Sequence, residues 1–362
     1  MENRLDRVGI ADDYFRSKYQ LALLRKVYHF LEDTQHLVPK YVVEQGEYMI
    51  LNFLRTISGV LGDMDSNARM FNARFDINLP LKFIENLNLK EIIEYAKVKN
   101  FRYAWLLEMC YCSIMMMIEQ DSLKYYLTLK GLVKQHFDKF KREEKSNWLI
   151  VLTNYCVLKS IDNENYFRKE VFEINKFQLN ENVLSDQRYL SKILFTQIIR
   201  NALSINETKW VKHFIDKYVP MLKPSYQKSM RALGSAYLNF KLKNFDAVIE
   251  NLKNVKFIDS RDKLNVRNLY VRTYYELNET EAVLSQIDST KHFVNKNPSF
   301  TSKTKTNYIK SLNLLNRLIT ANYNNDADEI EFIRKAVEED SEIILGKWLL
   351  EKIEELKTKN AK

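Results

Sequence analysis

The stretch that decides the fold is residues 206–255, NETKWVKHFIDKYVPMLKPSYQKSMRALGSAYLNFKLKNFDAVIENLKNV. Its first large apolar side chains recur at a spacing of four and therefore share one side of a helix. These side chains are Trp210, Phe214 and Tyr218. Pro220 and Pro224 mark the end of that helix and the start of the next one, and Asn244 interrupts the second helix. The stretch predicts three consecutive helices joined by short turns.

Two further details of this stretch can be predicted. Asn206 stands where its side chain can accept a hydrogen bond from an early backbone N–H, so we expect it to cap the first helix. Trp210 belongs to an apolar face wide enough to be packed on two sides. We therefore expect Trp210 to be buried between helices.

The unit of helix, turn and helix recurs along the chain. A later helix carries Leu269 and Tyr274, breaks at Asn278 and is followed by a short helix through Ala282. Val248 and Ala282 occupy matching places in two successive units and are 34 residues apart. This interval is typical of two-helix repeats, in which each pair buries its apolar face only against the next pair.

The composition supports an all-α fold. The chain has 362 residues with only 7 Gly and 5 Pro, too few for the tight turns that a β fold requires. Hydrophobic residues make up 46% and charged residues 28%, which is typical of a folded globular chain rather than a disordered one.

The basic balance of the chain raises the question of nucleic-acid binding. The formal net charge is +9 and the pI is about 9.1, and basic surfaces bind phosphate through counterion release. The excess is mostly lysine, it is scattered, and it accompanies the Asn, Ile and Tyr that an AT-rich genome encodes. These features argue against phosphate binding as the main function. The basic pI and a period near 35 nevertheless leave an RNA-binding helical repeat as the alternative function. The local basic clusters are Lys139, Lys141 and Arg142, and Lys303, Lys305 and Lys310.

The chain gives no sign of export or of membrane insertion. Its first 31 residues contain four acidic residues and no long apolar stretch, so we expect no secretory signal and a cytoplasmic protein. The longest uncharged apolar run, Met109 to Ile118, is well short of the roughly 20 residues that cross a bilayer, so we expect a buried helix there. Three cysteines, Cys110, Cys112 and Cys156, fit a reducing compartment and a place in the core.

Two short stretches carry a family resemblance. LGSAY at residues 233–237 is followed by NFDAVI at residues 244–249, with extra residues between the two elements, and Leu269 to Ala282 carries the same pattern without them but with Tyr270 in place of a small residue. The chain thus resembles the tetratricopeptide-repeat superfamily, and it is most similar to degenerate, uncharacterised bacterial members. The resemblance implies an all-α superhelical stack of antiparallel helix pairs, a tetratricopeptide-like α-solenoid with a C-terminal capping helix.

The patterning predicts four parts. Asp63 to Leu79 lacks a period, and we expect a loop there. In the predicted capping helix, one apolar stripe faces the stack and the other side, including Lys352, faces solvent. The stripe consists of Leu345, Trp348, Leu349, Ile353 and Leu356. The predicted parts are an N-terminal helical segment at 1–62, an irregular and helical connection at 63–100, the repeats at 101–325, and an acidic segment with the capping helix at 326–362.

The sequence offers little that could carry catalysis. The glycines never approach a phosphate-binding fingerprint, so we expect neither a nucleotide cofactor nor any other. His29, Glu32 and His36 could share a metal if one helix continued through them, but the Glu-Asp-Thr-Gln segment indicates a helix end instead. We therefore predict no catalytic residues, no metal site and no enzymatic activity.

The predicted function is a protein–protein interaction scaffold. Concave surfaces of helical repeats hold a peptide or a helix of a partner protein, and the first helix of each pair lines that surface in the family. Val271 departs from the family's carboxylate-clamping pattern, so recognition of a C-terminal carboxylate is not predicted. The resemblance implies a partner-binding set of Tyr237, Phe240, Lys241, Arg267, Val271 and Tyr274.

Overall fold

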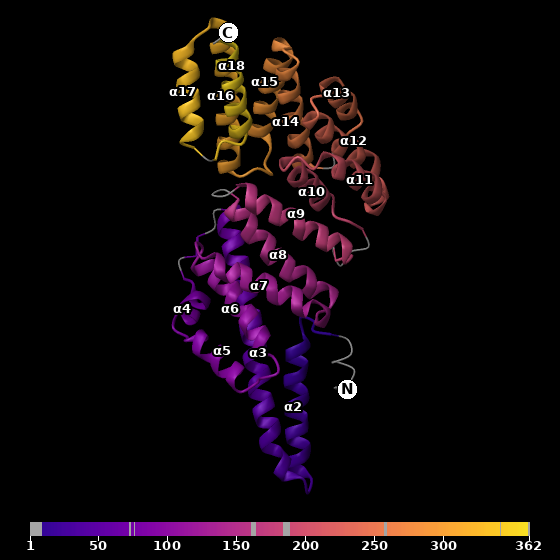
Figure 1. The fold of residues 1–362 in the computed structure, drawn as a ribbon, viewed down its shortest axis with the longest axis vertical. Helices are drawn as coiled ribbons and strands as arrows, with labels where there is room; N and C mark the ends of the chain where they lie inside the picture. The colour runs from indigo at the N-terminus through magenta and orange to yellow at the C-terminus, as the bar shows by residue number, and fades with distance from the viewer. Residues whose placement is uncertain are drawn as a thin grey trace. The chain divides into compact units, whose positions relative to one another are not determined.

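The computed structural model describes residues 9–71, 74–75, 77–160, 164–183, 189–256, 259–340 and 342–360. Within these ranges all regular structure is helical, with seventeen α-helices, three short 3-10 helices and no strand (Figure 1). The predicted all-α class is confirmed. The chain divides into two compact units, unit 1 at Met1–Leu190 and unit 2 at Ser191–Lys362. The four-part division made from the sequence stays a prediction.

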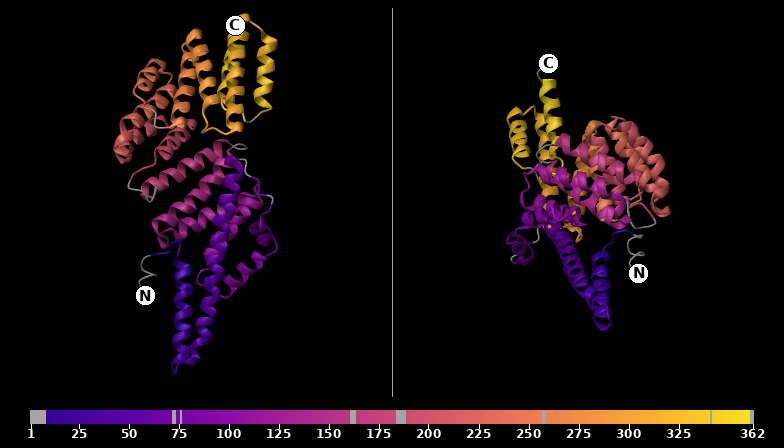
Figure 2. Two further views of the ribbon diagram at one scale, coloured as in Figure 1. Left: turned by 180° about the vertical axis from the view of Figure 1, so that it is seen from behind. Right: turned by 60° about the horizontal axis from the view of Figure 1, so that its bottom comes forward.

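Unit 1 is built around one long helix. In chain order its helices are α2 (Tyr14–Leu31), α3 (Val38–Phe71), α4 (Leu79–Glu85), α5 (Leu89–Val98), α6 (Ala104–Ile118), α7 (Leu123–His136), α8 (Arg142–Lys159) and α9 (Glu164–Asn180), with 3-10 turns at Gln35–Leu37 and Phe137–Lys139. Helix α2 packs along α3, α6 packs against α3 and α7, and α8 packs against α9. The two helices α2 and α3 form a hairpin that stands out from the other helices of unit 1 in every view (Figure 2).

Helix α6 supplies much of the core of unit 1. Leu106, Met109 and Ile114 are completely buried there, as expected for the long apolar run. Met117 is only partly buried and Ile118 is exposed, so burial stops before the end of that run. All three cysteines are buried and unpaired, which confirms their predicted place in the core.

A buried ion pair joins α3 to α8. The Arg55 guanidinium donates to both carboxylate oxygens of Glu144, whose side chain is only 2% exposed, and also to the Asp12 carboxylate. Burial raises the pKa of Glu144, and the Arg55 charge opposes that rise. The attraction between Arg55 and Glu144 therefore offsets the free-energy cost of removing both charges from water.

The loop predicted at Asp63 to Leu79 is wrong in its first half, because α3 continues to Phe71. Leu61, Met64 and Ala68 extend the spacing of three and four on its apolar side. The Asn67 amide donates to the Asp63 carbonyl one turn earlier, which keeps this polar side chain compatible with the helix. Residues 72, 73 and 76 lie outside the described residues.

Unit 2 is a succession of helix pairs followed by a single helix. The elements are α10 (Lys192–Ser204), α11 (Thr208–Tyr218), a 3-10 turn (Val219–Met221), α12 (Pro224–Lys241), α13 (Phe245–Lys253), α14 (Ser260–Glu276), α15 (Thr280–Lys296), α16 (Ser302–Asn324), α17 (Ala327–Glu338) and α18 (Gly346–Asn360). Helix α12 packs against α10, α11, α13 and α14, and α16 packs against α15 and α17. The breaks predicted at Asn244 and Asn278 are confirmed, and the helix predicted for 206–218 begins at Thr208.

The turns within pairs share one backbone device. The first helices α10, α12, α14 and α16 are each followed by a residue in the left-handed region. The next backbone N–H then donates to a carbonyl in the last turn of that helix, which satisfies a carbonyl the helix leaves unpaired. The four residues are Asn206, Lys243, Asn278 and Asn325. Asn206 thus ends α10, with φ 66°, and the N-cap of α11 is Glu207, which corrects the predicted role of Asn206.

An aromatic stack on α11 is centred on Phe214 and not on Trp210. Phe214 is 1% exposed, and its ring lies between those of Phe195, at 5.2 Å, and Tyr218, at 4.9 Å. Trp210 also stacks on Phe214, at 5.1 Å, but it remains partly exposed. Trp210, expected to be buried between helices, is thus only partly buried, and Phe214 occupies the centre of the stack.

The apolar stripe predicted for the last helix is confirmed, since all five of its members are buried. The predicted solvent side is wrong at Lys352, whose side chain is only 3% exposed. Its Nζ donates to Glu276 at the end of α14 and to Glu355 on its own helix. Helix α18 is therefore held to α14 by charge as well as by apolar contact.

Candidate functional site

Aromatic and cationic side chains from five helices of unit 2 meet in one cluster. Each of α10, α12, α14, α16 and α18 contributes at least one side chain. The first four are the first helices of successive pairs, and α18 is the single helix that follows the last pair. We call this group the Arg272 cluster. Its members are Arg200, Tyr237, Phe240, Asn268, Arg272, Tyr308 and Trp348.

Arg272 stands at the centre of the cluster. Its guanidinium carbon lies 4.2 Å from the Phe240 ring centroid and 5.5 Å from that of Trp348. Desolvation lowers the pKa of Arg272 to about 10, and its buried Nε has no hydrogen-bond acceptor. The carboxylate nearest in sequence, Glu276, accepts instead from Trp348 Nε1 at 2.9 Å and from Lys352. Glu276 and Glu351 act on Arg272 through their charge, but the guanidinium forms no ion pair with any described residue.

Polar groups beside Arg272 extend the cluster. Asn268 donates through Nδ2 to the Tyr308 hydroxyl at 3.2 Å, while its buried Oδ1 has no donor. Burial raises the pKa of both Tyr237 and Tyr308, and the nearby Arg200 charge opposes the rise at each. Arg200 is exposed and forms no ion pair with any described residue. The cluster therefore carries two cations, neither of which forms an ion pair with a described residue.

The structure separates the predicted partner-binding residues. Tyr237 and Phe240 lie in the Arg272 cluster, and Lys241 is exposed at the end of α12. Val271 is completely buried in the core, so it cannot contact a partner, and its place in the predicted set is corrected.

The other two members of the predicted set lie outside the cluster. Arg267 donates to Ser289 of α15 at 2.8 Å. Tyr274 stacks on Tyr270, 5.8 Å away. Successive side chains on a helix point about 100° apart. A predicted register that is wrong by one residue is therefore enough to place Arg267 on a different side of α14 from Asn268 and Arg272.

The residues that the sequence missed form their own stripe. Asn268, Arg272 and Glu276 recur every four residues along α14, a spacing that places them on one side. Such a polar stripe is a detectable signal, but it normally indicates a solvated face. Only the folded chain shows Phe240 and Trp348 covering Arg272, because these rings come from positions distant in sequence.

The histidine group near the N-terminus is not a metal site. Helix α2 ends at Leu31, which confirms the predicted helix end, and His36 lies in the following 3-10 turn. His29 Nδ1 pairs with the Thr34 hydroxyl at 2.7 Å. Across the described ranges, no three His, Cys, Asp or Glu side chains are grouped so that they could hold a metal ion. Nor is any described helix both long and apolar enough to cross a bilayer.

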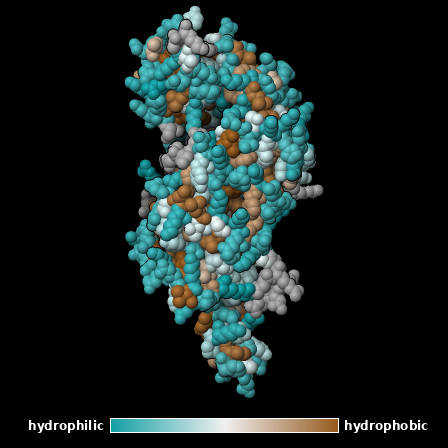
Figure 3. Space-filling model, viewed as in Figure 1, coloured by the Kyte–Doolittle hydropathy of each residue, from teal (hydrophilic) through white to brown (hydrophobic). Residues whose placement is uncertain are grey.

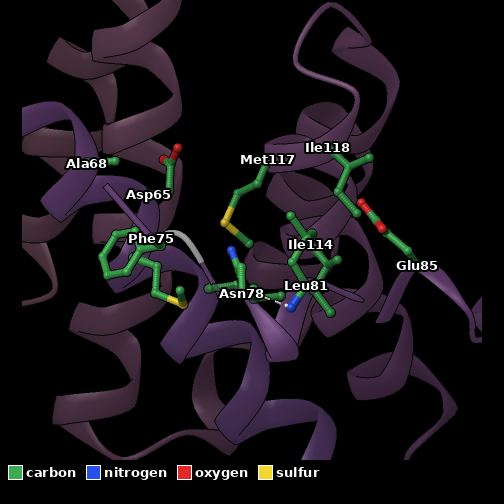
Figure 4. A pocket seen from close by; sticks show the side chains of 11 residues that line it. Asp65, Ala68, Phe75, Asn78, Leu81, Glu85, Ile114, Met117 and Ile118 are labelled. Carbon is green, nitrogen blue, oxygen red and sulfur yellow. Dashed lines mark hydrogen bonds between the residues drawn. The ribbon is translucent and has the colours of Figure 1, made fainter. Parts of the chain in front are cut away.

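Unit 1 contains a separate pocket of about 360 Å³ between α3, α4 and α6 (Figure 4). Its described lining is mostly apolar, with Asp65 and Glu85 as the charged members. Asn78 points toward Met117, while its side-chain oxygen accepts the Leu81 N–H at the start of α4. The described lining contains no histidine, cysteine or hydroxyl group.

Comparison with protein-family models, with curated proteins and with solved structures finds no match for this chain. Its function therefore has to be inferred from the geometry of its own residues.

Proposed function

We propose that the chain is a non-catalytic interaction scaffold whose unit 2, a tetratricopeptide-like α-solenoid capped by α18, binds an acidic segment of a partner protein at the Arg272 cluster. The observation that carries this proposal is the Arg272 guanidinium, which lies against two rings, has a buried Nε without an acceptor and forms no ion pair with a described residue. The partner is a peptide or helix bearing Asp or Glu. The setting is cytoplasmic, as the composition predicts.

The energetics of Arg272 support this ligand chemistry. A buried donor without an acceptor costs about 1–3 kcal/mol, and more when it is charged. A partner carboxylate would supply the acceptor in a desolvated setting, where guanidinium–carboxylate hydrogen bonds are strong and directional. Arg200, exposed near Tyr237, would add a second attraction for the same ligand.

The arrangement of unit 2 supports the solenoid assignment. Successive pairs are closed by left-handed turns, and α12 packs against members of both the preceding and the following pair. At Gly234 a Cβ atom would lie 3.0 Å from Ile199 Cδ1, so the absence of a side chain permits the close approach of α10 and α12. First helices that pack closely together would bring their exposed residues onto one continuous surface.

The alternative of RNA binding is less well supported by the same geometry. RNA is typically held by bases stacked on aromatic faces, with phosphates on cations. Here the rings of Phe240 and Trp348 already face the Arg272 guanidinium. We therefore favour an acidic protein segment and treat RNA as an outcome of the experiment.

The test is a selection of random displayed peptides on the full-length chain, followed by titration of the enriched peptides. We expect enrichment of Asp and Glu, and at least about 10-fold weaker binding by Arg272→Gln and by Arg200→Gln, because each loses a charge-assisted contact. Arg267→Gln is the matched control, since Arg267 also has a buried Nε without an acceptor but lies outside the cluster.

Several outcomes would count against the proposal. They are peptides without acidic enrichment, equal losses in Arg267→Gln and Arg272→Gln, or single-stranded RNA binding more tightly than the best peptide. Circular dichroism of each variant separates lost binding from lost folding. Arg200→Gln is the safer variant in this respect, because Arg200 is exposed.

A further inference from the structure

The α2–α3 hairpin of unit 1 carries its apolar side chains on the outside. Nine large apolar residues in its distal half are between 46% and 76% exposed. They are Leu24, Val27, Tyr28, Phe30, Leu31, Val42, Val43, Met49 and Ile50, and we call them the hairpin surface. In one view the space-filling hairpin shows apolar groups among polar ones (Figure 3). Isolated exposed apolar residues are ordinary, whereas this many on one two-helix element are not.

Polar and aromatic contacts hold the distal hairpin together instead. Lys26 Nζ donates to Gln45 Oε1 at 3.1 Å, and the His29 ring stacks on Tyr41 at 5.1 Å with only 3° between the planes. The guanidinium of Arg25 lies 5.7 Å from the same Tyr41 ring. A hairpin normally buries apolar residues between its helices and exposes polar ones. This inversion indicates that another surface covers the outside.

The pattern on α3 is that of a helix-packing seam. Val42, Gly46 and Met49 follow one another at spacings of four and three, which is the interval of coiled-coil contacts. The next position in this series, Phe53, instead packs on Phe83 of α4. Gly46 has nothing within 4 Å of where its Cβ would be, so no contact within the chain requires a glycine there. A glycine inside a helix costs about 1 kcal/mol relative to alanine. It does, however, let a second helix approach closely.

The two helices of the distal hairpin carry charges of opposite sign that can pair between two copies. In the distal half, α2 carries Arg25 and Lys26 and no acidic residue. Helix α3 presents Glu44 and Glu47 close together, and Glu47 makes no ion pair with any described residue. In a two-fold arrangement, the cationic α2 of each copy can lie against the acidic pair on α3 of the other. Such an interface is isologous, so one surface serves both partners.

The exposed area also has the size that a dimer needs. Nine apolar side chains exposed to this degree present on the order of 800 Å², the share that one partner contributes to a stable interface of standard size. A membrane fits less well, because the turn joining the helices carries Glu32 and Asp33 at its outer end, where an anionic lipid surface would repel them.

We propose that the hairpin surface is a homodimer interface, in which the α2–α3 hairpins of two copies pack as a four-helix bundle. The apolar residues of both hairpins form its interior. Lys26 of each copy lies near Glu47 of the other. The Arg272 cluster takes no part in this association.

Sedimentation velocity of the full chain between about 1 and 100 μM tests the proposal. We expect dimers, with the double variant Val42→Glu/Met49→Glu raising the dimer Kd at least about 100-fold, since carboxylates would be buried in the interface. The matched control is Ile150→Glu/Val157→Glu on α8, whose residues have the same spacing and are 47% and 55% exposed. The control should dimerise normally, and both variants should keep their helical signal.

A mixing experiment identifies the occupant as a second copy. Lys26→Glu alone and Glu47→Lys alone should each dimerise poorly, because like charges meet, whereas their equimolar mixture should form dimers. A native chain that stays monomeric at 100 μM overturns the proposal, as does a dimer indifferent to Val42→Glu/Met49→Glu. A monomer that binds anionic vesicles through these residues overturns it in favour of a membrane. A mixture that remains monomeric overturns the pairing of α2 with α3.

Discussion

Removing Arg55 should destabilise unit 1 far more than removing an exposed arginine elsewhere. The Glu144 side chain is 2% exposed and that of Arg55 is 10% exposed, so Arg55→Met would leave a buried carboxylate without its counter-charge. Breaking such a pair from one side costs about 3–5 kcal/mol. Arg317→Met is the matched control, because the Arg317–Glu329 pair is 45% and 29% exposed and should contribute less than about 1 kcal/mol.

Urea unfolding, followed by circular dichroism and by tryptophan fluorescence, measures both effects. Glu144→Gln in the Arg55→Met background should recover part of the loss, because the buried charge disappears. Without Arg55, the pKa of Glu144 should rise further, so Arg55→Met should lose more stability at pH 8 than at pH 5. A loss below about 1 kcal/mol, or one equal to that of Arg317→Met, would refute the assignment of Glu144 as a buried, charged residue.

Three further predictions concern single positions. Lys243→Asn should stabilise unit 2 by about 0.5–1 kcal/mol in thermal unfolding, because Lys243 is exposed and its φ of 61° suits asparagine better; a lower Tm would contradict this. Burial and the Lys139 charge lower the pKa of His136, so the unfolded chain binds a proton at His136 more readily than the folded chain does. The free energy of unfolding should therefore fall as the pH drops below about 6.5, and it should fall less steeply in His136→Gln; identical pH profiles of the two proteins would argue against this. Phe214→Ala should cost about 3–5 kcal/mol and Trp210→Ala distinctly less, since only Phe214 is fully buried; the reverse order would show that the stack is centred on Trp210.

The helical class and several turns were predictable because they depend on local chemistry. Scarce glycine and proline excluded strands, and Asn244 and Asn278 marked real breaks. The end of α3 was not predictable from its polar composition, because Met64 and Ala68 sufficed to continue the helix.

The candidate site was harder to predict than the helices that carry it. Tyr237 and Phe240 of the predicted set lie in the Arg272 cluster, whereas the predicted Arg267 lies one residue before the cluster member Asn268 and faces Ser289 instead. Lys352 shows a second difficulty. Its position predicts a solvated lysine, and only folding brings it to Glu276, 76 residues away in the chain. Charge pairs between such distant positions leave no periodic signal in the sequence.

The left-handed turns of unit 2 allow asparagine and glycine to be compared as turn residues. Three of the four are closed by asparagine, which accepts positive φ with modest strain. Glycine would fit without strain but would give the unfolded chain more freedom, a difference of about 0.4–1 kcal/mol per site. The two effects nearly cancel. Asparagine can therefore take the place of glycine at these turns with little change in folding free energy, whereas Lys243 carries the strain of positive φ without either advantage.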